Sequence, residues 1–99
     1  MRQPPALIDG ARVVAWAGLA TARPTGATRH SYGVPGDSVP VNDLFAGIAV
    51  ARYDDEDDGW YLFYCDADWR TVTDTWHETY EAAVKQAAFE FEGVVLVEA

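Results

Sequence analysis

Short hydrophobic runs separated by polar turn residues fill the middle of the chain. Runs of this length between turn residues are typical of β-strands, and they predict strands in LFAGIAVARYD (44–54), WYLFYCD (60–66) and TVTDTW (71–76). The acidic DEDDG (55–59) and the segment ADWR (67–70) separate these runs and are predicted to be turns. Three consecutive strands joined by short turns form an antiparallel meander.

The hydrophobic pattern changes from period two to period 3.6 within DTWHE (74–78). Thr79 is a suitable N-cap, and Gly93 can adopt the left-handed conformation that ends a helix. We therefore predict a helix over residues 80–91. Its apolar stripe follows the spacing i, i+3, i+4, i+7 and i+11, and consists of Tyr80, Ala83, Val84, Ala87 and Phe91.

The rest of the chain has a weaker pattern. ARVVAWAGLA (11–20) is predicted to be a first strand, although its alanines also allow a helix, and VVLV (94–97) a short last strand. Residues 21–43 are rich in Pro, Gly, Ser and Thr, and predict a long loop. With 99 residues the chain forms one domain. We expect an α+β fold: an antiparallel sheet of three to five strands with one long C-terminal helix packed on one face.

The predicted strand 60–65 is apolar on both faces. One helix covers only one face of a sheet, so the other face must be covered by the N-terminal segment with its loop, by a second copy of the chain, or by a partner. All three remain open at this stage. Exposed apolar patches mark interaction sites, which makes Trp60 and Tyr64 candidate binding residues. The two faces hold, respectively, Trp60, Leu62 and Tyr64, and Tyr61, Phe63 and Cys65.

DTWHE places a tryptophan beside one of only two histidines. We expect Trp76 to be buried under the start of the helix. His77 would then lie near the helix N-terminus, whose positive macrodipole disfavours protonation. A structural or surface role is favoured for His77 over a catalytic one, but His77 and His30, from the loop 21–43, are kept as candidate binding residues.

Catalytic and metal sites are not predicted. If the strands meet at the turn 66–70, Cys65 lies at that turn and His77 about 20 Å away, too far for a nucleophile and its base. No paired Cys or His spacing of a zinc site is present. Asp54, Glu56, Asp58 and Gly59 match the first positions of an EF-hand loop, but position 12 falls on Cys65. We therefore expect an acidic turn, no metal and no cofactor.

Charge separates the two halves of the chain. Sixteen Asp and Glu against seven Lys and Arg give a net charge of −9, and thirteen of the acidic residues lie in residues 44–99. A field of this sign repels phosphate backbones and argues against nucleic acid, while it allows a basic protein partner. The candidate contacts are four acidic residues of the turn, Asp54, Asp55, Asp57 and Asp58. The alternative is that the charge only maintains solubility.

Cellular location is predicted from what the sequence lacks. No signal-peptide pattern and no apolar run of about 18 residues is present, and the single cysteine cannot form an internal disulfide. We expect a cytoplasmic protein that does not enter a membrane.

The segment WRTVTDTWHETYEAAVKQAAFEFEG (69–93) resembles a stretch shared by small bacterial proteins. In that group an aromatic strand and a D-T-W-H element precede a Glu- and Ala-rich C-terminal helix. No activity is established for the group, so the resemblance implies a bacterial origin and a recurring strand-to-helix joint, and it assigns no catalytic residue.

These observations favour a small acidic protein-binding module, either a regulator or an immunity-type inhibitor of a basic partner, with homodimerisation as a further expectation. The alternative is a small-molecule or metal-dependent enzyme with a pocket between the loop 21–43 and the aromatic sheet face, lined by His30, His77 and tyrosines. A third hypothesis, single-stranded nucleic acid stacked on the aromatic residues, needs a basic groove, and the charge argues against it.

Overall fold

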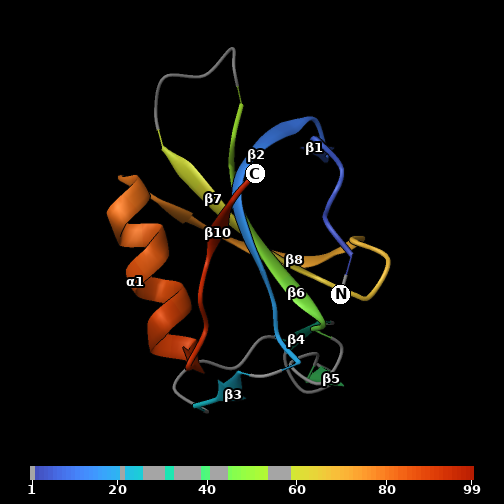
Figure 1. Cartoon of the computed structure of the whole chain (residues 1–99), viewed down its shortest axis with the longest axis vertical. Coiled ribbons are helices and arrows are strands. Elements are labelled where there is room, and N and C mark those ends of the chain that lie inside the picture. Colours follow the sequence, from blue (N-terminus) through green and yellow to red (C-terminus); the bar gives the residue numbers. More distant parts are fainter. Residues whose placement is uncertain (1, 21, 26–30, 33–38, 41–44, 54–58) are drawn as a thin grey trace.

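The computed structural model describes residues 2–20, 22–25, 31–32, 39–40, 45–53 and 59–99. Figure 1 shows a twisted sheet with one helix beside it. In chain order the elements are β1 (Leu7–Ile8), β2 (Ala11–Gly18), β3 (Arg23–Pro24), β4 (Ser31–Tyr32), β5 (Val39–Pro40), β6 (Gly47–Arg52), β7 (Trp60–Cys65), β8 (Thr71–His77), α1 (Tyr80–Glu90), β9 (Phe91–Glu92) and β10 (Val97–Glu98).

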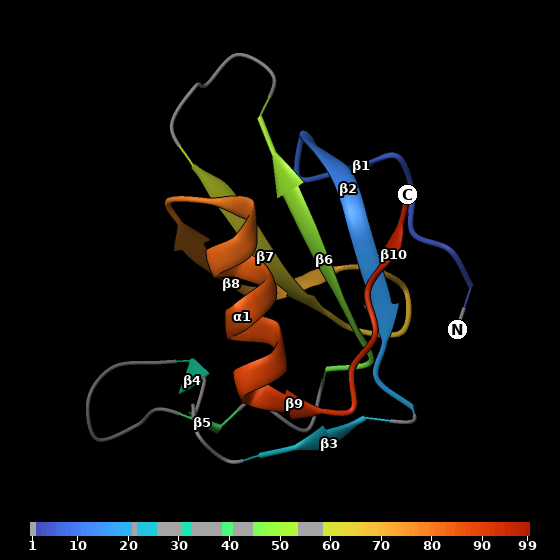
Figure 2. The same cartoon turned by 60° about the vertical axis from the view of Figure 1, so that its left-hand side comes forward.

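The main sheet is antiparallel and has the order β1-β2-β6-β7-β8, with β10 also paired to β2. Two short pairs, β3 with β9 and β4 with β5, lie outside it. Figure 2 shows β10 running beside β2, and α1 in front of β7 and β8. The predicted α+β class, the antiparallel sheet and the meander of three strands are confirmed.

Several element boundaries differ from the prediction. The second long strand begins at Gly47 rather than at residue 44, and the last strand is 97–98 rather than 94–97. The helix ends at Glu90 because Phe91 already has an extended backbone, with φ −132°, and pairs with Pro24. At the other end the Thr79 hydroxyl accepts a hydrogen bond from the Ala82 amide at 3.0 Å, so the predicted N-cap is present.

Two buried clusters lie on opposite faces of β6 and β7, because alternate residues of a strand point to opposite faces. Ala83 and Ala87 of α1 belong to the first cluster, with Ala15, Ala17, Ile48, Val50, Leu62, Tyr64 and Phe91. The second cluster contains Ile8, Ala11, Val13, Ala49, Ala51, Phe63, Cys65 and Trp69. The chain itself therefore supplies much of the cover of the second face.

The N-terminal segment is held against this second face by Trp69. The indole Nε1 of Trp69 donates a hydrogen bond to the Arg2 carbonyl at 3.0 Å, and its ring packs edge-on against Trp16 at 5.9 Å. Figure 1 shows the N-terminus beside the β7–β8 turn that carries Trp69. The sequence allowed three ways to cover this face: the N-terminal segment, a second copy of the chain, or a partner. The contact between Trp69 and Arg2 belongs to the first of these.

Candidate functional site

Strand β8 forms one edge of the main sheet. Its residues pair with β7, from Cys65 opposite Thr71 to Trp60 opposite His77. Within the described ranges, no strand pairs with its other side. The opposite edge of the sheet differs, because β1 and β10 both pair along the outer side of β2. An edge strand presents backbone N–H and C=O groups that another extended chain can pair with.

Trp76 points away from the helix side of β8. Its side chain is 50% exposed, so the predicted burial under the helix is wrong. The reason is the strand period: Thr75 and His77 occupy the helix side, which leaves Trp76 on the other face, opposite Tyr61. Gly59 provides room for the ring, because a Cβ atom there would overlap the Trp76 indole.

Asp74 shares the outward face with Trp76 and is also exposed. Residues two apart on a strand are separated by about 7 Å, so the carboxylate and the indole form one continuous patch along the edge. We call Asp74 and Trp76 the edge patch. Neither residue was predicted to be a binding residue, although the alternation within TVTDTW places both on one face.

A buried polar network lies on the other side of β8. The Thr75 hydroxyl is 2.7 Å from the His77 Nε2 and 3.4 Å from the Tyr64 hydroxyl. The Tyr64 hydroxyl donates to the Glu90 carboxylate, which also accepts from the Gln86 side-chain amide at 3.1 Å. Tyr64 is fully buried and Glu90 is 4% exposed. The network therefore connects the C-terminal end of β8 to the last turn of α1.

The acid–base properties of this network suit a structural role. Burial, reinforced by the bond to Glu90, raises the pKa of Tyr64 well above its ordinary range, so the hydroxyl stays a donor. Burial lowers the pKa of His77, and the Glu90 carboxylate opposes part of that change. The direction for His77 agrees with the sequence argument, but the cause is desolvation rather than the helix macrodipole.

Cys65 and His77 lie at opposite ends of β7 and β8, as the register shows. Burial raises the pKa of the Cys65 thiol to about 12, so the sulfur stays protonated near neutral pH. These two residues do not form a nucleophile and its base. Among the described residues, no three His, Cys, Asp or Glu side chains gather in a group that could hold a metal ion.

The remaining candidate residues are dispersed. Trp60 packs against Tyr80 at 5.4 Å, and the Arg52 guanidinium lies 4.8 Å from the centre of its ring. Tyr64 is enclosed by the network and is not accessible from the surface. Five candidates fall outside the described residues: His30, Asp54, Asp55, Asp57 and Asp58.

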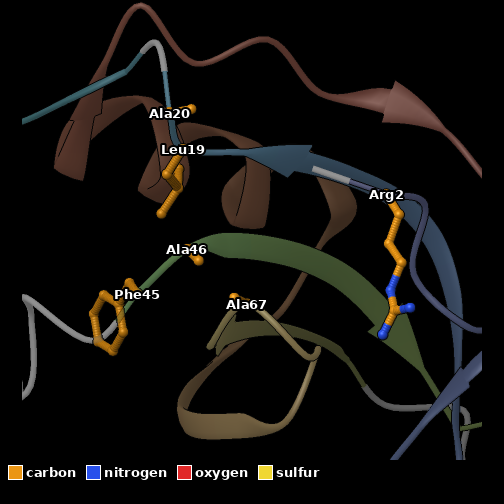
Figure 3. Close-up of a pocket in the computed structure, with 6 residues that line it drawn as sticks. All are labelled: Arg2, Leu19, Ala20, Phe45, Ala46 and Ala67. Atoms are coloured by element: carbon orange, nitrogen blue, oxygen red, sulfur yellow. The ribbon is translucent and has the colours of Figure 1, made fainter.

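An apolar pocket of about 500 Å³ opens at the end of the sheet distant from His77, beside the β7–β8 turn. Figure 3 shows Leu19 and Phe45 toward one side of it, the Arg2 guanidinium toward the other, and Ala46 and Ala67 between them. A second pocket, of about 400 Å³, includes Trp60 and Tyr80 in its wall. Of the described residues, no histidine lines either pocket.

The first pocket could not be predicted from the sequence, because its walls come from segments far apart in the chain. No local spacing relates Arg2 to Leu19, Phe45 and Ala67. Only the antiparallel pairing of β2 with β6 and of β6 with β7 places these segments at the same end of the sheet.

The chain matches no protein-family model, curated protein or solved structure. The resemblance over residues 69–93 therefore stays a prediction. Among the described residues, no helix has both the length and the apolar character needed to cross a membrane.

Proposed function

We propose that this chain is a small acidic protein-binding module that accepts an extended basic segment of a partner protein as an additional strand beside β8. The observation that carries the proposal is the open edge of β8 in the described structure, together with the edge patch on its outward face. Strand addition at a sheet edge is a recurring mode of peptide recognition, in which backbone hydrogen bonds give affinity and alternate side chains give specificity.

The edge patch favours a particular partner strand. A lysine or arginine opposite Asp74 would gain an attractive cross-strand pair. An apolar side chain, or an arginine stacked on the ring, would suit Trp76. The net charge of −9 would also speed the encounter with a basic surface. A regulator or inhibitor of a basic cytoplasmic protein fits this chemistry.

A second copy of the chain is a less suitable occupant. Suppose that two copies pair antiparallel along β8 so that all seven residues of each strand overlap. Asp74, the central residue, would then lie opposite Asp74 of the other copy. Like charges directly opposite one another destabilise a sheet. Thr75 and His77 belong to the polar network, whereas Asp74 and Trp76 are exposed, so the edge patch is the part of β8 that a partner would contact.

The test uses two synthetic peptides of strand-forming sequence, matched in length to β8. One peptide alternates threonine with lysine around a central phenylalanine, and the other has glutamate in place of lysine. Binding is measured by NMR on the ¹⁵N-labelled chain. We expect the basic peptide to shift the β8 amides and to slow their hydrogen exchange, and the acidic peptide to bind more weakly.

Charge reversal makes the test specific. Asp74→Lys should make the chain bind the acidic peptide more tightly than the basic one, while Trp76→Ala should weaken the binding of both peptides. Glu81→Lys, an equal charge change at an exposed position in the first turn of α1, serves as the matched control and should leave the preference unchanged. Equal responses to Asp74→Lys and Glu81→Lys would refute recognition at the edge patch, as would unchanged exchange of the β8 amides.

A further inference from the structure

We propose that the apolar pocket beside the β7–β8 turn binds a small molecule that has one carboxylate and an apolar body, with Arg2 as the carboxylate-binding residue. This site lies toward the Thr71 end of β8, whereas Trp76 is near the other end of that strand. The inference goes beyond the proposed recognition of a partner strand and does not depend on it.

The apolar wall of the pocket is formed by residues whose backbone is fixed. The Leu19 amide donates to the Ala46 carbonyl at 2.9 Å, and the Ala46 amide donates to the Cys65 carbonyl at 2.8 Å. The Phe45 ring packs against the Tyr64 ring, with centroids 5.1 Å apart. An apolar ligand would therefore enter a largely preformed space and would not have to order these segments on binding.

The β7–β8 turn is also held in one conformation. The Asp66 carboxylate accepts hydrogen bonds from the Asp68 amide at 2.9 Å and from the Arg70 amide at 3.0 Å. Trp69 adopts a left-handed backbone conformation, with φ 62°, which is unfavourable for a bulky residue. From this position its indole donates to the Arg2 carbonyl. The turn thus supplies Ala67 to the pocket and holds the Arg2 backbone in place beside it.

Among the described residues that line this pocket, Arg2 is the charged one. Its guanidinium lies 4.0 Å from the Asp68 carboxylate, at the outer limit of an ion pair, and the two side chains are 77% and 65% exposed. Such a pair contributes little, so a ligand carboxylate can displace Asp68. The planar guanidinium binds a carboxylate through two parallel hydrogen bonds.

The chemistry of the described part of the wall favours a ligand with a single negative charge. Leu19, Ala20, Phe45, Ala46 and Ala67 offer no polar side chain to a second anionic group. The chain also carries a net charge of −9, which opposes multiply charged anions. An aliphatic or aromatic monocarboxylate satisfies both the apolar wall and the guanidinium, whereas a phosphate ester would leave its second charge without a partner.

The experiment titrates the ¹⁵N-labelled full chain with octanoate and, separately, with 1-octanol, which has the same chain length and no charge. We expect octanoate to give saturable amide shifts at Leu19, Phe45, Ala46 and Ala67, and to bind more tightly than 1-octanol. Absence of saturable shifts at these residues up to about 10 mM octanoate, a concentration well above a millimolar dissociation constant, would overturn the proposal.

Two variants separate the charged and apolar contributions. Arg2→Gln should weaken octanoate about tenfold, the loss expected for a charge-assisted hydrogen bond at a solvent-exposed rim, and should leave 1-octanol unchanged. Ala67→Trp, at an exposed turn position, should fill the pocket and weaken both ligands. Ala88→Trp, at an exposed position of α1, is the matched control and should affect neither. Equal affinity of Arg2→Gln and the parent chain for octanoate would refute the role of Arg2.

Discussion

Tyr64→Phe removes one hydroxyl group and no apolar surface, so it isolates the buried network from the packing of the ring. The hydroxyl donates to the carboxylate of Glu90, a residue that is only 4% exposed, and the Thr75 hydroxyl is 3.4 Å from it. Hydrogen bonds to charged groups contribute about 1.5 to 3 kcal/mol, and a buried acceptor that loses a donor is not compensated by water. We therefore expect Tyr64→Phe to lower the free energy of unfolding by about 2 kcal/mol.

Urea denaturation followed by circular dichroism and tryptophan fluorescence measures this loss, which is a large fraction of the stability of a domain of this size. Tyr61→Phe, on the opposite face of the same strand and half-buried, is the matched control and should change the stability by less than about 0.5 kcal/mol. A double-mutant cycle with Glu90→Gln should give a coupling energy of about 1 kcal/mol or more. A loss below about 0.5 kcal/mol for Tyr64→Phe would show that the Tyr64 hydroxyl contributes little to stability, and would refute the reasoning.

Three further predictions concern single residues. Trp76→Ala should lower the free energy of unfolding by less than about 2 kcal/mol in urea titration, well below the 3 to 5 kcal/mol typical of a buried aromatic, because half of the side chain is exposed. The folded state lowers the pKa of His77, so the contribution of this residue to stability is complete above pH 6.5 and is lost as the pH falls below that value. The Tm of His77→Gln should therefore depend less on pH between 5 and 7 than the Tm of the parent chain. Cys65, buried and with its pKa raised to about 12, should react with iodoacetamide at pH 8 only as fast as the native state opens, and rapid modification of the folded chain would contradict this.

Sequence alone predicted the central strands, the helix and the two apolar faces, because each depends on a local period. Residues 60–65 alternate between two buried clusters, as their composition indicated. Thr79 caps the helix through an interaction that is local in sequence. Features of this kind need no knowledge of which distant segments meet.

Features that depend on pairing between distant segments were not predicted. The hydrogen bond from Trp69 to Arg2 spans 67 positions and determines how the N-terminal segment covers the second face. The early end of the helix has a similar origin, because Phe91 leaves the helical conformation to pair with Pro24. Neither contact leaves a periodic signal in the sequence.

The position of Trp76 and the burial of His77 both follow from the alternation of side chains along β8. Because side chains alternate, a strand that turns His77 toward Thr75 and the helix side must turn Trp76 toward the opposite face. His77, at the junction of β8 with the helix, and the edge patch thus lie on opposite faces of one strand. A substitution that shifts the register of β8 would disturb both, and a loss of binding after it would say nothing about recognition. Only changes restricted to the outward face, at Asp74 and Trp76, can therefore separate the binding function from the stability of the strand that carries it.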